Sequence, residues 1–154
     1  MIKLLNDFIR LFNASLMLDQ NLVEKRENRY YLLSENLKRF IKKDFLYAGT
    51  YLGETRGGTF LPSSIFLSMI AETAKNKTYV DQKTEWLFVC GRDIFKKGVT
   101  RVNGSREKDD FTLIMNVHDE CIGFGTMTGA LNEKGENVAV RNMFDIGDFL
   151  RREK

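Results

Sequence analysis

The apolar residues of this chain change their spacing near residue 77, and this change constrains the fold more than any other feature of the sequence. Before it, apolar side chains recur at helical spacing between short segments rich in β-favouring residues. After it, short strands alternate with polar turns, a pattern typical of a small barrel. The sequence therefore predicts an α+β fold class, with a small N-terminal α/β domain at 1–77 and a C-terminal mixed β pseudo-barrel at 78–154.

In the first half, residues 2–18 are expected to form an amphipathic helix, because their apolar side chains fall on one stripe. Ser34 is expected to cap a second helix, and the segment from Pro62 to Ser64 is expected to start a third that runs to Ala74. Between these helices we expect a charged turn at 24–29, strands at 30–33 and 45–52, and a glycine-rich turn at 53–58.

In the second half, most segments are expected to be strands. A short helical segment is expected at 93–97. Another is expected to close the chain, where Ile146, Phe149 and Leu150 share one face. The expected strands are 78–80, 85–90, 99–102, 111–117, 121–131 and 138–142.

Positive charge is concentrated in one window of the chain. The whole chain has a formal net charge of only +3, but residues 75–106 carry eight Lys or Arg against three Asp or Glu. Cations grouped at an exposed edge can follow a phosphate backbone. The alternative is a solvated face that only keeps the protein soluble. The candidate cations are Arg92, Lys96, Lys97, Arg101, Arg151, Arg152 and Lys154.

Three glycines invite a nucleotide-binding interpretation that their spacing does not support. A dinucleotide fingerprint needs its third glycine three residues after the second. Gly123 and Gly125 are followed at that place by Thr128, and the next glycine is Gly129. We expect these glycines on a bent barrel strand, where another backbone or a ligand comes close.

The remaining reactive side chains do not form a recognisable catalytic or metal site. Two cysteines and one histidine are too few for the usual four-ligand zinc site. Cys90 and Cys121 lie in apolar runs and are expected to be buried thiols of a reducing compartment. His118 is expected in a hairpin turn, and Asp109 and Asp110 in a solvated loop. We therefore expect no catalytic residue, no metal and no cofactor.

The sequence predicts a soluble intracellular protein with no membrane partner. Lys3, Asp7 and Arg10 interrupt any apolar core of a signal peptide. No apolar stretch approaches the roughly 20 residues that a membrane span needs.

Two segments of the second half resemble a known RNA-binding module. Residues 88–102, with Lys97-Gly98-Val99 before the next strand, look like the opening of a PUA domain, and Asp145-Ile-Gly-Asp-Phe-Leu-Arg151 looks like its closing segment. Together with Ile122-Gly-Phe-Gly125 and Gly49-Thr-Tyr-Leu-Gly-Glu-Thr55, these motifs resemble the pre-ribosomal PUA-domain family of archaea and eukaryotes, the 60S ribosome-subunit biogenesis or pre-rRNA processing proteins. The resemblance covers about residues 30–154.

The resemblance implies a non-catalytic RNA-binding adaptor of large-subunit biogenesis, with a PUA-type domain at 78–154. It implies binding of single-stranded, U- or A/U-rich RNA in a groove beside the short helix and the final strand. Glycines there would let phosphate approach main-chain N–H groups. The residues that this implies are Gly91, Arg92, Lys96, Lys97, Gly98, Val99, Arg101, Arg151 and Arg152.

The resemblance also implies partners and a place in the cell. Pre-rRNA is the expected nucleic acid, and the Shwachman–Bodian–Diamond protein and exosome components are the implied protein partners. The protein would be cytoplasmic in an archaeon and nuclear or nucleolar in a eukaryote. Two alternatives stay open: the PUA module of an RNA-modification system, and a translation-factor-like module that binds tRNA or the small subunit.

Overall fold

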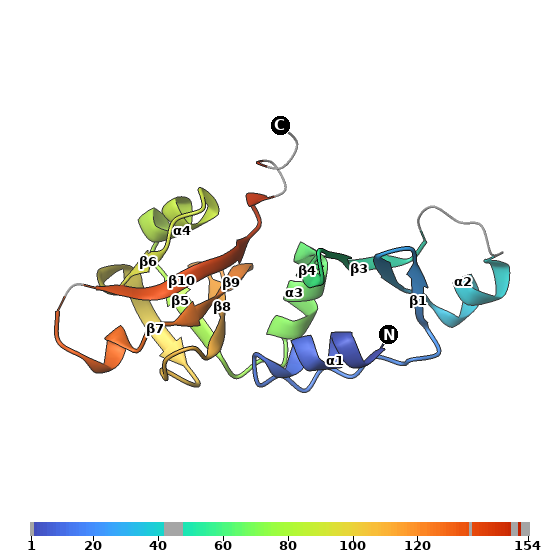
Figure 1. Ribbon diagram of the computed structural model, residues 1–154, viewed down its shortest axis with the longest axis horizontal. Coiled ribbons are helices and arrows are strands. Elements are labelled where there is room, and N and C mark those ends of the chain that lie inside the picture. Colours follow the sequence, from blue (N-terminus) through green and yellow to red (C-terminus); the bar gives the residue numbers. More distant parts are fainter. Residues whose placement is uncertain (1, 42–47, 136, 149–150, 152–154) are drawn as a thin grey trace.

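The computed structural model describes residues 2–41, 48–135, 137–148 and 151. Figure 1 shows a sheet at each end of the molecule, with helices α1 (Ile2–Arg10) and α3 (Ser64–Ala71) between them. Within these described residues, no helix is both long and apolar enough to cross a membrane.

The N-terminal half is built on a four-stranded antiparallel sheet in the order β1-β2-β3-β4. Ser34 and Ser63 are the N-caps of the helices that follow them, as predicted. Each serine hydroxyl accepts a hydrogen bond of 3.1 Å from the main chain three residues later. Besides α1 and α3, the elements are β1 (Val23–Arg26), β2 (Arg29–Leu32), α2 (Glu35–Phe40), β3 (Thr50–Arg56) and β4 (Thr59–Pro62).

The C-terminal half is a curled six-stranded sheet, a half-barrel, in the order β6-β10-β9-β8-β5-β7. Its strand pairs are antiparallel except β5 with β8. The predicted mixed β pseudo-barrel of an α+β protein is confirmed. Its elements are β5 (Lys77–Val80), α4 (Gln82–Val89), β6 (Ile94–Phe95), the 3₁₀ turn η1 (Lys96–Gly98), β7 (Val99–Asn103), β8 (Phe111–Met115), β9 (Cys121–Met127), η2 (Ala130–Asn132) and β10 (Val138–Asp145).

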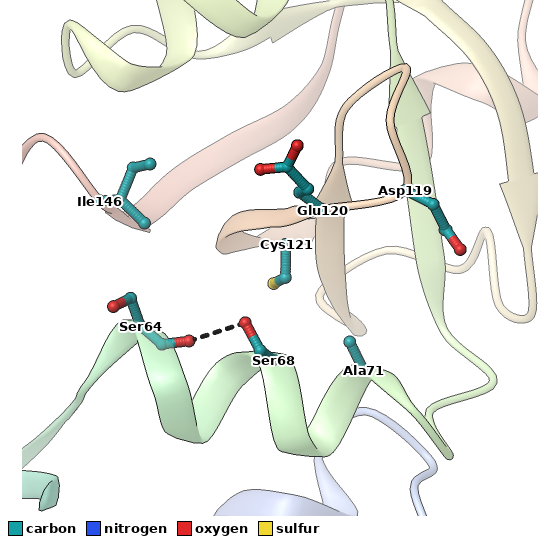
Figure 2. Close-up of a pocket in the computed structure, with 7 residues that line it drawn as sticks. All are labelled: Ser64, Ser68, Ala71, Asp119, Glu120, Cys121 and Ile146. Atoms are coloured by element: carbon teal, nitrogen blue, oxygen red, sulfur yellow. Dashed lines mark hydrogen bonds between the residues drawn. The ribbon is translucent and has the colours of Figure 1, made fainter.

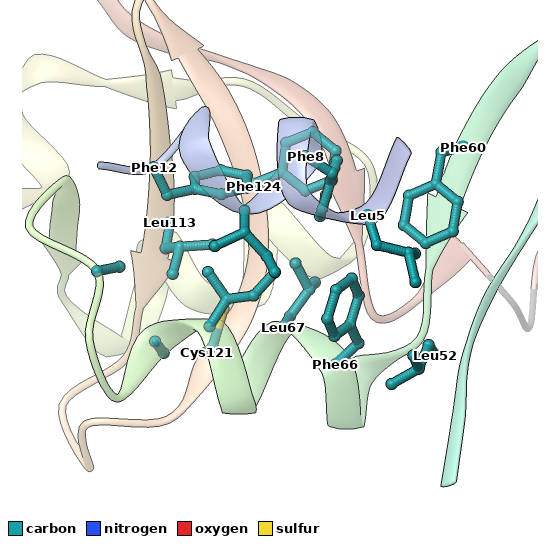
Figure 3. Packing of buried hydrophobic residues seen from close by; sticks show 14 of the residues in the cluster. Leu5, Phe8, Phe12, Leu52, Phe60, Phe66, Leu67, Leu113, Cys121 and Phe124 are labelled. Atoms are coloured by element: carbon teal, nitrogen blue, oxygen red, sulfur yellow. The ribbon is translucent and has the colours of Figure 1, made fainter. Parts of the chain in front are cut away.

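One hydrophobic core joins the two halves. Phe8 of α1, Phe12 of the turn after it and Phe66 of α3 pack in the same cluster as Leu113 of β8 and Phe124 of β9. Figure 3 shows these side chains meeting between α1, α3 and the strands of the half-barrel. The division into domains at 1–77 and 78–154 stays a prediction, but the two parts share buried surface.

A second core fills the inside of the half-barrel under α4. Val80 of β5, Phe88 of α4 and Ile94 of β6 are among its fully buried members. Val80 and Tyr79 are successive residues of β5, and successive side chains of a strand point to opposite faces of the sheet. Because Val80 belongs to this cluster and Tyr79 packs on the shared core, the two clusters lie on opposite faces of the sheet.

Several boundaries in the N-terminal half differ from the prediction. The expected charged turn at 24–29 is the hairpin of β1 and β2, closed by the pair Glu27-Asn28. Glu27 adopts a positive φ of 53°, which such a short turn requires. The expected helix at 2–18 ends at Arg10, and Asn13 follows with a φ of 51°. β3 runs on to Arg56, so the glycine turn is shorter than predicted, and residues 42–47 lie outside the described part.

The largest error in the C-terminal half is at 85–90, which is helical rather than a strand. Asp81 caps α4, because its carboxylate accepts a 2.7 Å hydrogen bond from Thr84 N. Thr84 and Phe88, four residues apart, bury the inner face of the helix. The expected helical segment at 93–97 is split into β6 and η1. Of the closing helix, Phe149 and Leu150 lie outside the described residues.

Two of the three glycines, Gly123 and Gly125, lie on a bent strand as predicted, whereas Gly129 follows the end of β9 and caps η2. A Cβ added at Gly123 would lie 2.1 Å from Phe144 O, and one at Gly125 would lie 2.2 Å from Arg141 O. Both positions therefore let β10 approach β9 closely, and the register between these strands shifts there.

Candidate nucleic-acid interface

The turn after α4 presents Arg92 at the surface. Gly91 has a φ of +93°, its N–H donates to Phe88 O at 2.9 Å, and Arg92 N–H donates to Leu87 O at 3.1 Å. This is a Schellman motif, which ends a helix on a left-handed residue that is usually glycine. Arg92 is exposed, and its guanidinium makes no hydrogen bond or ion pair with any described residue.

The next basic element is η1. Lys97 is exposed, and within the described ranges its ammonium makes no hydrogen bond or ion pair. Lys96 is half-buried: its N–H donates to Asn137 O at 2.9 Å, and its Nζ donates to Glu133 O. Lys97 therefore has a free charge, while Lys96 ties η1 to the loop before β10.

Gly98 has a structural reason to be glycine. It is buried, and a Cβ there would lie 2.0 Å from Thr84 Oγ1 of α4. Its carbonyl accepts a hydrogen bond of 3.0 Å from Asp81 N–H. The residue therefore lets η1 pack against the start of α4, and no ligand is needed to explain it.

Replacing Gly98 with alanine is expected to lower the free energy of unfolding by about 1–3 kcal/mol, because the added methyl group overpacks Thr84. Urea denaturation would measure the loss. Lys97→Ala, one residue away and exposed, is the control and should change stability by less than about 0.5 kcal/mol. A Gly98→Ala variant of unchanged stability that no longer bound RNA would instead support the idea that phosphate approaches the main chain here.

A polar groove lies beside β6 and the final strand, where the resemblance places RNA. Its volume is about 550 Å³. Arg141 of β10 lies in its wall, is exposed, and its guanidinium makes no hydrogen bond or ion pair with the described part of the chain. The lining residues are Asp93, Thr128, Ala130, Glu133, Asn137, Val138 and Arg141.

Two exposed aromatic residues accompany these cations. Trp86 of α4 is 68% exposed and Phe95 of β6 is 48% exposed. Exposed aromatic rings near cations suit single-stranded nucleic acid, because unpaired bases stack on them. Sequence reasoning missed both residues and Arg141. The sequence feature that could have indicated Trp86 and Phe95 is an aromatic residue within the basic window at 75–106. The expected strand at 85–90 drew attention away from Trp86.

Arg101 lies apart from this group. Its guanidinium is 3.9 Å from the ring centroid of Tyr79, and the Tyr79 hydroxyl donates to Asp119 Oδ1 at 2.9 Å. Burial raises the pKa of Tyr79, and the hydrogen bond to Asp119 raises it further. Because Tyr79 packs on the shared core, Arg101 lies on the face of the sheet opposite α4. The half-buried Val99, in the same strand, packs on the inner core instead.

The sequence suggested that the guanidinium of Arg151 would be unpaired, but the structure shows that it is paired. Its Nη2 donates to Asp145 Oδ2 at 2.7 Å, and its Nη1 donates to Val89 O at 2.7 Å. The hydrogen bond to Asp145 raises the pKa of Arg151 further above its ordinary value. The expectation of a free guanidinium is therefore wrong for Arg151, because a buried carboxylate takes its charge. Arg152 and Lys154 lie outside the described residues.

A second hollow lies between α3 and the hairpin of β8 and β9. Figure 2 shows Cys121 directed toward Ser68 across it, with Ile146 at one side. Burial raises the pKa of the Cys121 thiol to about 11, so this thiol is a poor nucleophile. Cys90, expected to be buried, is exposed because it lies on the outer side of the last turn of α4. Among the described residues, no group of three or more His, Cys, Asp or Glu is placed to hold a metal ion.

Relatives of this chain are found among archaeal and eukaryotic proteins. A UPF0113 protein of Archaeoglobus fulgidus is 30% identical over 112 residues, which cover 70% of this chain and 63% of that protein. The chain thus matches less than two thirds of that relative's length. The 60S ribosome subunit biogenesis protein NIP7 homolog of Dictyostelium discoideum is 25% identical over 137 residues, 83% of this chain and 76% of that protein.

Solved structures agree with the fold. A conserved PUA domain protein from Thermoplasma acidophilum matches with a TM-score of 0.66 at 18% identity, over 99% of this chain and 93% of that one. A PUA domain from Aeropyrum pernix matches with a TM-score of 0.51 at 22% identity, over 60% and 55%. The model of the family described as UPF0113 PUA domain matches residues 76–154, just over half of the sequence, and the chain therefore belongs to that family.

Proposed function

We propose that this chain is a non-catalytic RNA-binding adaptor in large ribosomal subunit biogenesis, where it acts in pre-rRNA processing. The observation that carries the proposal is a set of unpaired cations around one edge of a PUA domain. The biogenesis role rests on the eukaryotic relatives, which are named 60S ribosome subunit biogenesis proteins.

The proposed contact surface is the edge formed by α4, the turn after it, η1 and the groove beside β10. Arg92, Lys97 and Arg141 would contact phosphates, and Trp86 and Phe95 would stack on bases. Stacking of this kind requires unpaired bases, so the ligand is single-stranded RNA. A preference for U- or A/U-rich sequence follows from the family resemblance. Lys96 and Val99 would support η1, and Gly91 and Gly98 would shape the two turns.

Protein partners and location are proposed on the resemblance alone. The Shwachman–Bodian–Diamond protein and exosome components are the proposed partners. The proposed location follows the organism, cytoplasmic in an archaeon and nuclear or nucleolar in a eukaryote, as the biogenesis role of the relatives suggests.

Binding of the whole protein to oligouridine of about 12 nucleotides tests the RNA proposal, with fluorescence anisotropy measured between about 50 and 200 mM salt. If three cations contact phosphates, log affinity should fall against log salt with a slope of about −2, since each contact on a single strand contributes about 0.7. Oligocytidine and duplex RNA of equal length are the controls. Absence of salt-dependent binding to either single strand would overturn the RNA proposal, and equal affinity for the two would overturn only the base preference.

A further inference from the structure

Side chains of the closing segment hold the turn that presents Arg92. We propose that Arg151 is a positioning residue for RNA binding, which acts with Asn142 and Asp145 to fix the turn at 91–93 and does not itself bind phosphate. The effect of Arg151 on RNA binding rests on the proposed RNA function, but the contacts that fix the turn do not depend on that function.

The first step is the set of contacts around Asn142. Its Nδ2 donates to Phe88 O at 3.0 Å and to Arg92 O at 3.3 Å, and its main-chain N–H donates to Asp93 Oδ1 at 2.9 Å. One residue of β10 thus binds both ends of the turn. Asp145 Oδ2 accepts a further hydrogen bond of 3.0 Å from the same amide, which orients it.

Arg151 completes this arrangement from the other side of the turn. One nitrogen of its guanidinium binds Asp145 and the other binds Val89 O, each at 2.7 Å. The planar guanidinium lies against Gly91, where an added Cβ would be 3.3 Å from Nη2. At Gly147 an added Cβ would be 2.1 Å from Val89 O, so glycine lets the closing segment come this near to α4. Asn142, through its side-chain amide and its main-chain N–H, and the fork of Arg151 therefore hold residues 88–93 from two directions.

Burial explains why Arg151 is committed to this contact. Asp145 is only 1% exposed, and its Oδ1 has no hydrogen-bond partner within the described residues. Removing one partner of a buried ion pair is strongly destabilising, because it leaves the other partner buried without compensation. A phosphate that recruited Arg151 would have to leave Asp145 in that state, whereas the nearby Arg92 has no partner to give up. The energetics therefore favour Arg92 as the phosphate ligand and Arg151 as its support.

A double-mutant cycle on the whole protein tests this, with affinity for oligouridine and its salt slope as readouts. Arg92→Ala should flatten the slope by about 0.7, one phosphate contact on a single strand. If Arg151 acts through the turn, Arg151→Ala should weaken binding by itself and add little in the Arg92→Ala background, and the double variant should also lose about 0.7. If Arg92 and Arg151 each bound a phosphate independently, their effects would add, and the double variant would flatten the salt slope by about 1.4. That result would overturn the proposal.

Two further variants sharpen the cycle. Asp145→Asn releases the guanidinium of Arg151. If Arg151 is a positioning residue, this variant should bind RNA more weakly. If Arg151 can bind phosphate directly once it is released, the variant should bind RNA more tightly. Arg151→Lys keeps the charge but not the two-pronged contact, so it should fail to restore affinity. Lys97→Ala is the matched control, because η1 lies outside the contacts of Arg151 and its effect should add to that of Arg151→Ala.

Amide hydrogen exchange of the free protein separates this inference from the RNA proposal. Protection at Gly91 and Arg92, whose N–H groups close the turn, should fall by about tenfold in Arg151→Ala, the factor expected from loss of one hydrogen bond. Protection in β8 should stay unchanged, which confirms that the variant is folded. Unchanged protection of the turn would overturn the inference even if the protein binds RNA, and loss of protection would support the clamp even if the wild type binds none.

Discussion

Replacing Phe8 with alanine is expected to lower the free energy of unfolding by about 3–5 kcal/mol. The ring of Phe8 lies 5.1 Å from that of Phe60, 5.3 Å from that of Phe12 and 5.5 Å from that of Phe124, centroid to centroid. Phe60 belongs to β4, Phe12 to the turn after α1 and Phe124 to β9 of the half-barrel, so one cavity would loosen both halves. A loss of this size is a large part of the total stability of an ordinary domain, which is about 5–15 kcal/mol.

Urea denaturation followed by two signals would measure this loss. Trp86, the only tryptophan, reports by fluorescence on the C-terminal half, and far-ultraviolet circular dichroism reports on the whole chain. Because the core is shared, both signals should move to lower urea together. Leu11→Ala, three residues along and partly exposed, is the control and should cost much less. A Phe8→Ala transition in which the fluorescence midpoint did not move would show that the two halves are stable independently.

The shared core also bears on the separation of the two halves. RNA binding could be tested with residues 78–154 alone, the predicted PUA-type domain. Without α1 and α3, the fully buried Leu113 and the nearly buried Phe124 would face water. A fragment of this kind exposes a contiguous apolar patch, which favours aggregation. Experiments on RNA binding are therefore better made with the whole chain.

Local signals in the sequence predicted the parts of the fold that depend on local chemistry. Ser34 and Ser63 cap helices because a hydroxyl can accept from the third following N–H wherever a helix begins. Residues 85–90 could not be assigned in this way. Their side chains favour strands, and the helix is stabilised by the Asp81 cap and by burial of Phe88 inside the half-barrel, which is a tertiary contact.

The candidate site was predicted in part for the same reason. Arg92 and Lys97 lie at the predicted edge, and neither side chain is paired with another described residue. Both lie in exposed turns, where few tertiary contacts can change what the local sequence predicts. Arg101 is close to them in sequence, but the alternation of a strand places it on the opposite face, beside Tyr79. The pairing of Arg151 with Asp145 depends on how the closing segment packs against α4, which no sequence spacing specifies. Arg141 enters the site only because β10 borders the groove.

Reversing both free charges, in Arg92→Glu/Lys97→Glu, is expected to weaken binding to oligouridine by about 3 kcal/mol, roughly a hundredfold. Each substitution removes a phosphate contact and adds a repulsion. Loss of two contacts should also flatten the salt slope by about 1.4. Since both side chains are exposed and make no hydrogen bond or ion pair with other described residues, folding should be almost unchanged, as circular dichroism would confirm.

The control for this variant is Arg101→Glu/Lys75→Glu, which makes the same change in net charge at exposed positions away from α4 and η1. Charges more than a Debye length of about 10 Å from the RNA are largely screened, so the control should lose less than about threefold in affinity. Equal losses in the two variants would mean that RNA senses only the total charge of the protein. A larger loss in the control would move the interface to the face of Tyr79 and Arg101, and would restore the sequence prediction that Arg101 binds RNA.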